Sequence, residues 1–127
     1  MVKKDLLHDK ARIQLAEKVA ASGVRHRQVL EAIATVPRHA FIDDGLDGRA
    51  YEDSALPIGH QQTISRPFTV ARFAEYALEG RKELDHVLEV GAGCGYQAAV
   101  FSKIAKRVVS IERIEALYDK AQKNLKQ

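Results

Sequence analysis

One unit near the carboxyl end of the chain constrains the fold more than any other part. Residues 86–90 form a nearly continuous apolar run, which is typical of a strand buried on both faces of a parallel sheet. A glycine-rich loop follows at 91–95, then a predicted helix from residue 96 to about 105 and a second strand at 107–111. A strand, a helix and a strand with such short connections predict a right-handed parallel crossover.

The remaining predicted elements are helices of ordinary length. Apolar residues at helical spacing predict helices at about 10–21, 26–35, 67–78 and 114–125. The first two form an N-terminal cap, and the third is expected to bury Val70, Phe73, Ala74 and Ala77. Residues 43–67 show neither helical nor strand periodicity. A stretch of that length in a compact domain is typically functional, and its apolar content favours an ordered loop.

The spacing of an acidic residue indicates a nucleoside ligand for the glycine loop. Glu112 closes the second strand and follows Gly91 by 21 residues, close to the spacing at which an acid meets ribose hydroxyls. Glycines after a strand let backbone approach a ligand closely. The alternative is a tight turn with an acid at a strand end by chance, but the strand, loop, helix and strand context favours the nucleoside.

Two residues separate the candidate nucleosides. The dinucleotide fingerprint needs a sixth-position glycine, which is Tyr96 here. Glu89 lies in the strand two residues before the loop, where a carboxylate repels a pyrophosphate and favours the ammonium of a methionine moiety. These residues favour S-adenosylmethionine over NAD. The chain also lacks the glycine-lysine loop of nucleoside triphosphatases.

Charge and composition argue against some classes of partner. The net charge is +3, and residues 103–127 hold seven Lys or Arg against three acids, or +4. A solvated helix face explains that excess better than nucleic-acid binding, because the chain has no tryptophan to stack on bases. No apolar run reaches the roughly 20 residues of a membrane span, and residues 1–10 do not resemble a signal peptide. A single cysteine, Cys94, fits a reducing compartment and predicts a cytoplasmic location.

Three segments together resemble the protein-L-isoaspartate O-methyltransferases. They are Tyr-Glu-Asp-Ser-Ala-Leu-Pro-Ile-Gly-His at 51–60, Gln-Thr-Ile-Ser-Arg-Pro at 62–67 and Val-Leu-Glu-Val-Gly-Ala-Gly-Cys-Gly-Tyr at 87–96. The glycine motif is shared by many methyltransferases, whereas the Thr-Ile-Ser-x-Pro loop is much more specific. The stretch from Val36-Pro37-Arg38 to Phe41 is also similar to this family.

The resemblance implies an α/β, Rossmann-like fold that uses S-adenosylmethionine to methylate the α-carboxylate of L-isoaspartyl residues in damaged proteins. It implies a single partial methyltransferase domain over 1–127, with a helical cap at 1–50, an active-site loop at 51–67 and the start of the core at 68–127. By position, Ser65 is the catalytic serine. The implied cofactor-binding residues are Thr63, Ile64, Ser65, Glu89, Gly91, Gly93, Gly95 and Glu112.

The chain departs from the family pattern after the second strand. Only 15 residues follow Glu112, and the further strands of this family have no counterpart, so we expect an incomplete fold with an unpaired sheet edge and an uncovered apolar face. Such a face allows self-association. The alternative functions are therefore a cofactor-binding or self-associating chain without catalysis.

Three side chains have plainer alternatives to a functional role. Ser65 lies where the N-cap of the helix opening at Pro67 belongs, although the Thr-Ile-Ser context favours the active-site role. Cys94 is predicted to be a small residue filling the loop and not a reactive thiol. His60 is predicted to be a surface or substrate-side residue, and the histidine spacing predicts no metal site.

Overall fold

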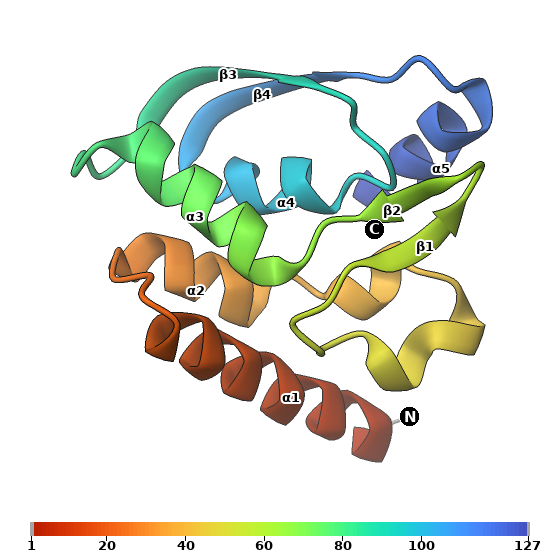
Figure 1. Ribbon diagram of the computed structural model, residues 1–127, viewed down its shortest axis with the longest axis horizontal. Helices are drawn as coiled ribbons and strands as arrows, with labels where there is room; N and C mark the ends of the chain where they lie inside the picture. Colours follow the sequence, from red (N-terminus) through yellow and green to blue (C-terminus); the bar gives the residue numbers. More distant parts are fainter. Residues whose placement is uncertain (1, 127) are drawn as a thin grey trace.

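The computed structural model describes residues 2–126 of the chain. That range forms five α-helices, two short 3₁₀ segments and two separate two-stranded sheets, arranged as in Figure 1. Their bounds are α1 Val2–Ala21, α2 Arg27–Thr35, 3₁₀ turns at Arg38–Phe41 and Asp44–Arg49, β1 Leu56–Gly59, β2 Gln62–Ile64, α3 Pro67–Leu78, β3 Leu84–Val90, α4 Tyr96–Ser102, β4 Ala105–Ile111 and α5 Glu115–Leu125.

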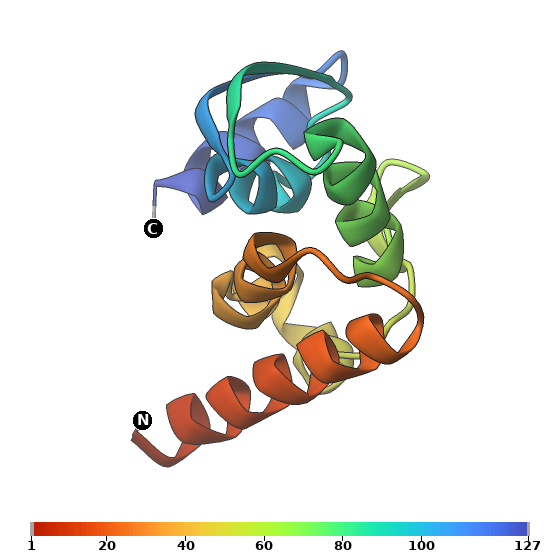
Figure 2. The ribbon, with the colours of Figure 1, turned by 90° about the vertical axis from the view of Figure 1, so that its left-hand side faces the viewer.

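The helices lie in layers beneath the β3–β4 sheet. Helix α4 packs against β4 with α3 beside it, α2 lies against both of these helices, and α1 forms the outermost layer (Figures 1 and 2). One cluster of buried apolar side chains runs through these layers, from Leu15 and Val19 in α1 to Val100 in α4 and Leu117 in α5. The sheet and its loops therefore rest on a continuous core.

Three of the predicted helices are confirmed, and the first is longer than expected. Helices α2, α3 and α5 match the expectations to within one residue at each end. Helix α1 begins at Val2, whereas the apolar pattern predicted a start near residue 10. The early turns of α1 are mostly exposed, so apolar spacing carries little signal there. The expected burial of Phe73 in α3 is wrong, because 56% of its surface is exposed.

The loop expected to lack regular structure contains a β-hairpin. Strand β1 pairs antiparallel with β2, with Leu56 opposite Ile64. The two-residue tip is His60-Gln61, with φ values of 56° and 59°. Two left-handed residues at a hairpin tip form the turn that matches the natural strand twist, a turn usually built from Asn-Gly or Asp-Gly. The His-Gln pair carries no such signal, which is why periodicity missed the hairpin.

The two strands of the glycine-loop unit pair in parallel, as predicted. Glu89 lies opposite Ser110 and Val90 opposite Ile111. Helix α4 ends at Ser102 and β4 begins at Ala105, so the predicted boundary near residue 105 was several residues late. The strand begins early because the Leu84 N–H donates to the Ile104 carbonyl at 2.8 Å.

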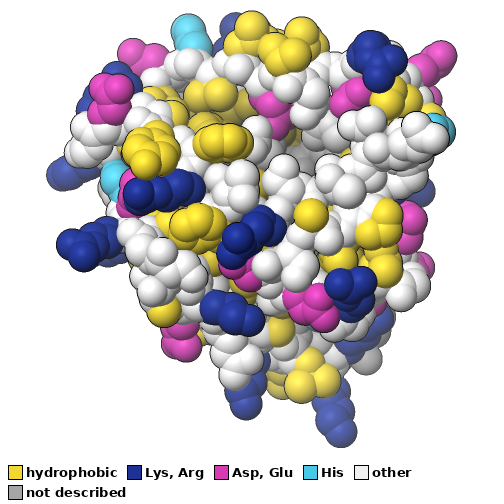
Figure 3. Space-filling model, in the orientation of Figure 1, with side chains coloured by type: hydrophobic (Ala, Val, Ile, Leu, Met, Phe, Trp, Pro, Cys, Tyr) yellow, Lys and Arg dark blue, Asp and Glu magenta, His cyan; other side chains and the backbone are white. Residues whose placement is uncertain are grey.

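The expectation that the first strand is buried on both faces is wrong. Leu88 and Val90 are 65% and 76% exposed, and Val109 and Ile111 continue the same outer face. Hydrophobic side chains accordingly lie at the upper edge of the molecule in Figure 3. The uncovered apolar face that the sequence predicted is therefore present on this sheet. Among residues 2–126, no helix combines the length and apolar character needed to cross a membrane.

Candidate functional site

Two neighbouring cavities surround the glycine loop. The smaller has a volume of about 80 Å³ and lies between the loop and the Thr63-Ile64-Ser65 segment, with Glu89 in its wall. The larger has a volume of about 480 Å³ and reaches the end of β4, with Glu112 in its wall. Thr63, Gly91 and Gly93 line both cavities. The structure thus brings together the predicted residues from the hairpin and from both parallel strands.

Glu89 is a buried carboxylate beside the smaller cavity. Only 7% of its surface is exposed. Its Oε2 accepts a hydrogen bond from the Gln97 amide nitrogen at 2.9 Å, and its Oε1 is buried without a partner among the described residues. Burial raises the pKa of Glu89, and the neighbouring side chains of Ser110 and then Gln97 oppose that shift. A buried carboxylate with one unpaired oxygen is suited to meeting a cationic group of a ligand.

Glu112 holds the glycine loop against the start of α5. Its Oε1 accepts the Gly93 N–H at 2.8 Å, and its Oε2 accepts the Ile114 N–H at 2.9 Å. These backbone hydrogen bonds, from Ile114 first and then Gly93, hold the pKa of Glu112 below its usual value. The carboxylate therefore stays ionised at neutral pH at the wall of the larger cavity.

The N–H groups at the start of the loop are already engaged by the protein. Gly91 and Ala92 both donate to the Ile111 carbonyl, at 2.8 and 3.1 Å, and Gly93 donates to Glu112. A phosphate-binding loop presents such groups to its ligand. The hydrogen bonding therefore argues against a phosphate group in this position, as the carboxylate of Glu89 also does.

Gly95 serves packing and not the cavities. It lines neither cavity, and its φ is +97°, a conformation that favours glycine. A Cβ at this position would lie 3.1 Å from Leu125 Cγ in α5. The same helix ties down the loop through Asn124, whose side-chain amide donates to the Cys94 carbonyl at 2.9 Å. Gly95 is therefore the predicted cofactor-binding residue that the geometry separates from the others.

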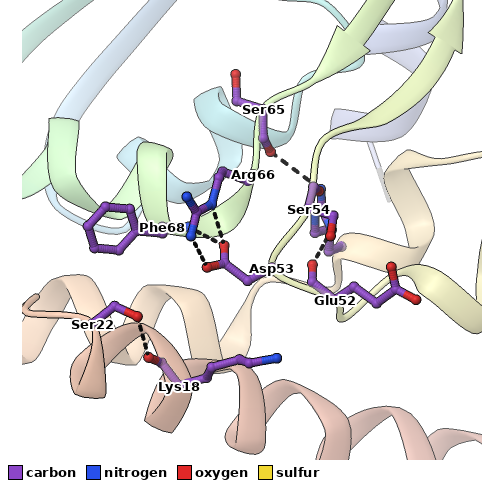
Figure 4. Close-up of polar contacts among 9 residues, drawn as sticks. Lys18, Ser22, Glu52, Asp53, Ser54, Ser65, Arg66 and Phe68 are labelled. Atoms are coloured by element: carbon purple, nitrogen blue, oxygen red, sulfur yellow. Dashed lines mark hydrogen bonds and ion pairs between the residues drawn. The ribbon is translucent and has the colours of Figure 1, made fainter.

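Ser65 presents its side chain to the smaller cavity. The residue is exposed, and it lies between β2 and α3. The helix α3 N-cap is Arg66, and no side chain of the cap residue bonds the helix. The alternative interpretation of Ser65 as an N-cap is therefore wrong. Figure 4 shows its hydroxyl directed away from its own carbonyl, which faces the protein interior.

A buried arginine that the sequence did not single out as functional holds this segment. Arg38 is fully buried, and its guanidinium donates to four backbone carbonyls at 2.7 to 3.3 Å. Three belong to Ala50, Glu52 and Ser54, and the fourth is that of Ser65. Arg38 thereby ties the segment before the hairpin to the residue after it. The resemblance in the Val36-Pro37-Arg38 stretch was the only sequence signal for it.

Asp53 makes a second connection between the segment before the hairpin and the residues after it. Its side chain is 7% exposed, and it pairs with the Arg66 guanidinium at 2.7 Å (Figure 4). Its other oxygen accepts the Phe68 N–H at 2.9 Å, so Asp53 supplies the hydrogen bond that an N-cap residue normally gives. Burial alone would raise the pKa of Asp53, but these two partners outweigh it and the pKa is lowered.

Cys94 is buried in the glycine loop, whereas His60 lies at the exposed hairpin tip. Cys94 is 2% exposed, and burial raises the pKa of its thiol, so the prediction of a small residue filling the loop is confirmed. His60 is exposed at the hairpin tip. Within residues 2–126, no three side chains of the metal-binding types gather in one place.

Comparison with known proteins assigns the family. Residues 10–127 match the family model described as protein-L-isoaspartate(D-aspartate) O-methyltransferase. The chain belongs to this family. The resemblance stated from the Thr-Ile-Ser-x-Pro loop and the glycine motif is thus confirmed.

Bacterial relatives carry the same family name at high identity. The protein-L-isoaspartate O-methyltransferases of Burkholderia lata and Burkholderia pseudomallei are 57% and 54% identical over 121 residues. Those matches cover 95% of this chain, whereas the chain spans 39% and 37% of the length of these relatives.

Solved structures of the family share the fold. A protein-L-isoaspartate O-methyltransferase structure matches with a TM-score of 0.79 and 30% identity, over 91% of this chain and 38% of that one. A Plasmodium falciparum structure with S-adenosyl-L-homocysteine matches with a TM-score of 0.75 and 23% identity, over 91% of this chain and 55% of that one. The fold is therefore the Rossmann-like methyltransferase fold predicted from the sequence, with two parallel strands in the described part.

Proposed function

We propose that the two cavities bind S-adenosylmethionine and that this chain carries the cofactor-binding part of an enzyme that methylates the α-carboxylate of L-isoaspartyl residues. The observation that carries the proposal is the pair of carboxylates at the cavity walls. Glu89 lies beside the smaller cavity and Glu112 beside the larger one. The smaller suits a methionine moiety and the larger an adenosine, with the ammonium near Glu89 and the ribose hydroxyls near Glu112.

The donor set fits this cofactor better than a phosphate-bearing one. Glu89 has a buried oxygen without a partner, and the first three loop N–H groups are taken by Ile111 and Glu112. A cationic, phosphate-free nucleoside meets both conditions. The relative from Plasmodium falciparum with the same fold was solved with S-adenosyl-L-homocysteine, the product form of this cofactor.

When bound, S-adenosylmethionine supplies a methyl group on a positively charged sulfur. A substrate carboxylate is already ionised at neutral pH, because an unperturbed aspartate has a pKa of about 3.9. The chain therefore needs no general base, and its residues have to align the reacting atoms and exclude water. Ser65 borders the smaller cavity beside Glu89, and we assign its hydroxyl to orient the substrate carboxylate by a hydrogen bond.

Titration calorimetry with S-adenosylhomocysteine and a methyl-transfer assay on an isoaspartyl peptide test the proposal. We expect the 127-residue chain to bind S-adenosylhomocysteine, and we expect Ser65→Ala in a chain with activity to lower kcat with little change in cofactor affinity. Ser54→Ala, outside the two cavities, is the matched control. Unchanged kcat in Ser65→Ala contradicts the role of Ser65, and no binding by the unmodified chain contradicts the cofactor assignment.

The exposed sheet face favours a second candidate function, which is self-association without catalysis. Leu88, Val90, Val109 and Ile111 form a contiguous exposed apolar surface, and such surfaces are commonly covered by another element or another chain. Sedimentation over a range of concentrations distinguishes this alternative, because self-association predicts a concentration-dependent mass. We place either form of the protein in the cytoplasm, in keeping with its single buried cysteine.

A further inference from the structure

The Glu89 carboxylate has two neutral polar neighbours, Gln97 and Ser110. Gln97, the second residue of α4, donates its side-chain amide to Glu89 Oε2 at 2.9 Å. Across the strand pair, Ser110 lies opposite Glu89, and its hydroxyl is buried without a partner among the described residues. The neighbouring Ser110 hydroxyl opposes the rise in the Glu89 pKa, whereas Gln97, from the helix following the glycine loop, makes the well-formed hydrogen bond that orients the carboxylate.

The groups around Glu89 leave its negative charge uncompensated. Gln97 from α4 and Ser110 from β4 are neutral, and Glu112 at the end of β4 is acidic. Among residues 2–126, no Lys, Arg or His forms an ion pair with Glu89. A buried carboxylate ordinarily pairs with a cation, because an uncompensated buried charge is costly. A cationic group of a bound ligand can supply the compensating charge.

The chemistry of the residue at position 97 matters for that role. An arginine or lysine there would pair with Glu89, neutralise it and compete with any ligand ammonium. An apolar residue would remove the 2.9 Å hydrogen bond and leave only the Ser110 hydroxyl beside the carboxylate. A glutamine fixes the carboxylate by a hydrogen bond and adds no charge.

We propose that Gln97 is a positioning residue, which orients Glu89 without neutralising it so that the carboxylate attracts the ammonium of the cofactor's methionine moiety. The inference rests on the proposed function. Both side chains line the smaller cavity, next to the Thr63-Ile64-Ser65 segment. Gln97 therefore acts on the amino-acid end of the cofactor and has no contact with the larger cavity, where the adenosine is placed.

Loss of the amide is expected to act through the protonation of Glu89 as well as its orientation. Burial already raises the pKa of Glu89, and the Ser110 hydroxyl and then the Gln97 amide oppose the shift. Without Gln97 the pKa rises further, so a larger fraction of Glu89 is neutral in mildly acidic solution. The affinity loss should therefore be greater at pH 6 than at pH 8.

Calorimetric titration of the 127-residue chain with two ligands tests this role. S-adenosylhomocysteine carries the ammonium group, whereas methylthioadenosine has the same nucleoside without the amino-acid end. We expect Gln97→Ala to lower the affinity for S-adenosylhomocysteine about tenfold, which corresponds to the loss of one hydrogen bond to a charged group. The affinity for methylthioadenosine should stay unchanged. Gln97→Met, which keeps the side-chain length, should give the same pattern if the alanine variant does not fold. Gln122→Ala, at an amide of α5 that bonds the Tyr118 hydroxyl, is the matched control and should change neither affinity.

Comparing the two ligands distinguishes failure of the inference about Gln97 from failure of the proposed function. Equal weakening of both ligands means that Gln97 serves only to support the fold, and unchanged binding of both means that it does not act on Glu89; either result overturns the inference while the proposed cofactor stands. If the unmodified chain binds neither ligand, the proposed function itself is wrong, and the inference falls with it.

Discussion

Replacing Arg38 with methionine tests the connection that it makes between Ser65 and the segment before the hairpin. Methionine keeps much of the side-chain length but none of the donors. Four carbonyls, those of Ala50, Glu52, Ser54 and Ser65, then lose a partner. The result should be a large loss of stability concentrated in this part of the chain.

The magnitude follows from how each carbonyl is placed. A buried acceptor left without a partner costs about 1–3 kcal/mol, and only the hydrogen bond to Ala50 is fully buried. The other three are partly buried, and water can replace much of what they lose. Removing a buried guanidinium also returns part of its desolvation cost. Together these effects give a destabilisation of about 4 kcal/mol, a large share of the roughly 5–15 kcal/mol that holds a domain.

Urea unfolding followed by far-ultraviolet circular dichroism measures the change, because the chain has no tryptophan. The control is Arg49→Met, which removes an exposed arginine that pairs with Glu52 on the surface. It should change the free energy of unfolding by less than about 1 kcal/mol. A shift in Arg38→Met no larger than that of the control would refute the reasoning.

Three further variants test individual contacts. Burial raises the pKa of Glu89 in the folded state above its ordinary value of 4.5. Glu89 therefore stabilises the fold less as the pH rises above 4.5, and the urea midpoint should decline from pH 4.5 to 8. Glu89→Gln should flatten that decline. Burial, and then the neighbouring His8, lowers the pKa of His39 in the folded state. The free energy of unfolding should therefore fall as the pH drops below 6.5. His39→Gln should weaken that pH dependence in the same urea assay. Gly95→Ala should destabilise the chain by about 1–3 kcal/mol, because it combines a positive φ with contact at Leu125; an unchanged melting temperature would contradict the packing role.

Much of the glycine-loop unit could be predicted from the sequence because its signals are local. A continuous apolar run, closely spaced glycines and an acid at a fixed distance define Glu89, the loop and Glu112 without any knowledge of tertiary contacts. The parallel pairing of β3 with β4 followed from the same pattern. Here local chemistry and tertiary structure agree, as they commonly do in natural proteins.

The contacts that position Ser65 could not be predicted because they join residues far apart in the chain. Arg38 and Ser65 are 27 positions apart, and Asp53 and Phe68 are 15 apart. Nothing in the identity of Arg38 shows that its guanidinium meets four carbonyls. The exposed outer face of β3 also depends on which elements cover the sheet, which an apolar run such as Val87-Leu88 does not specify.

The two hydrogen bonds of Glu112 have a consequence for how quickly a ligand is taken up. Because Gly93 and Ile114 are already bound to the carboxylate, the loop has its shape before any nucleoside arrives. Binding then requires little ordering of backbone, and its entropic cost falls mainly on the ligand. The association rate of the nucleoside should accordingly depend on diffusion into the larger cavity and show no slow phase from rearrangement of the loop.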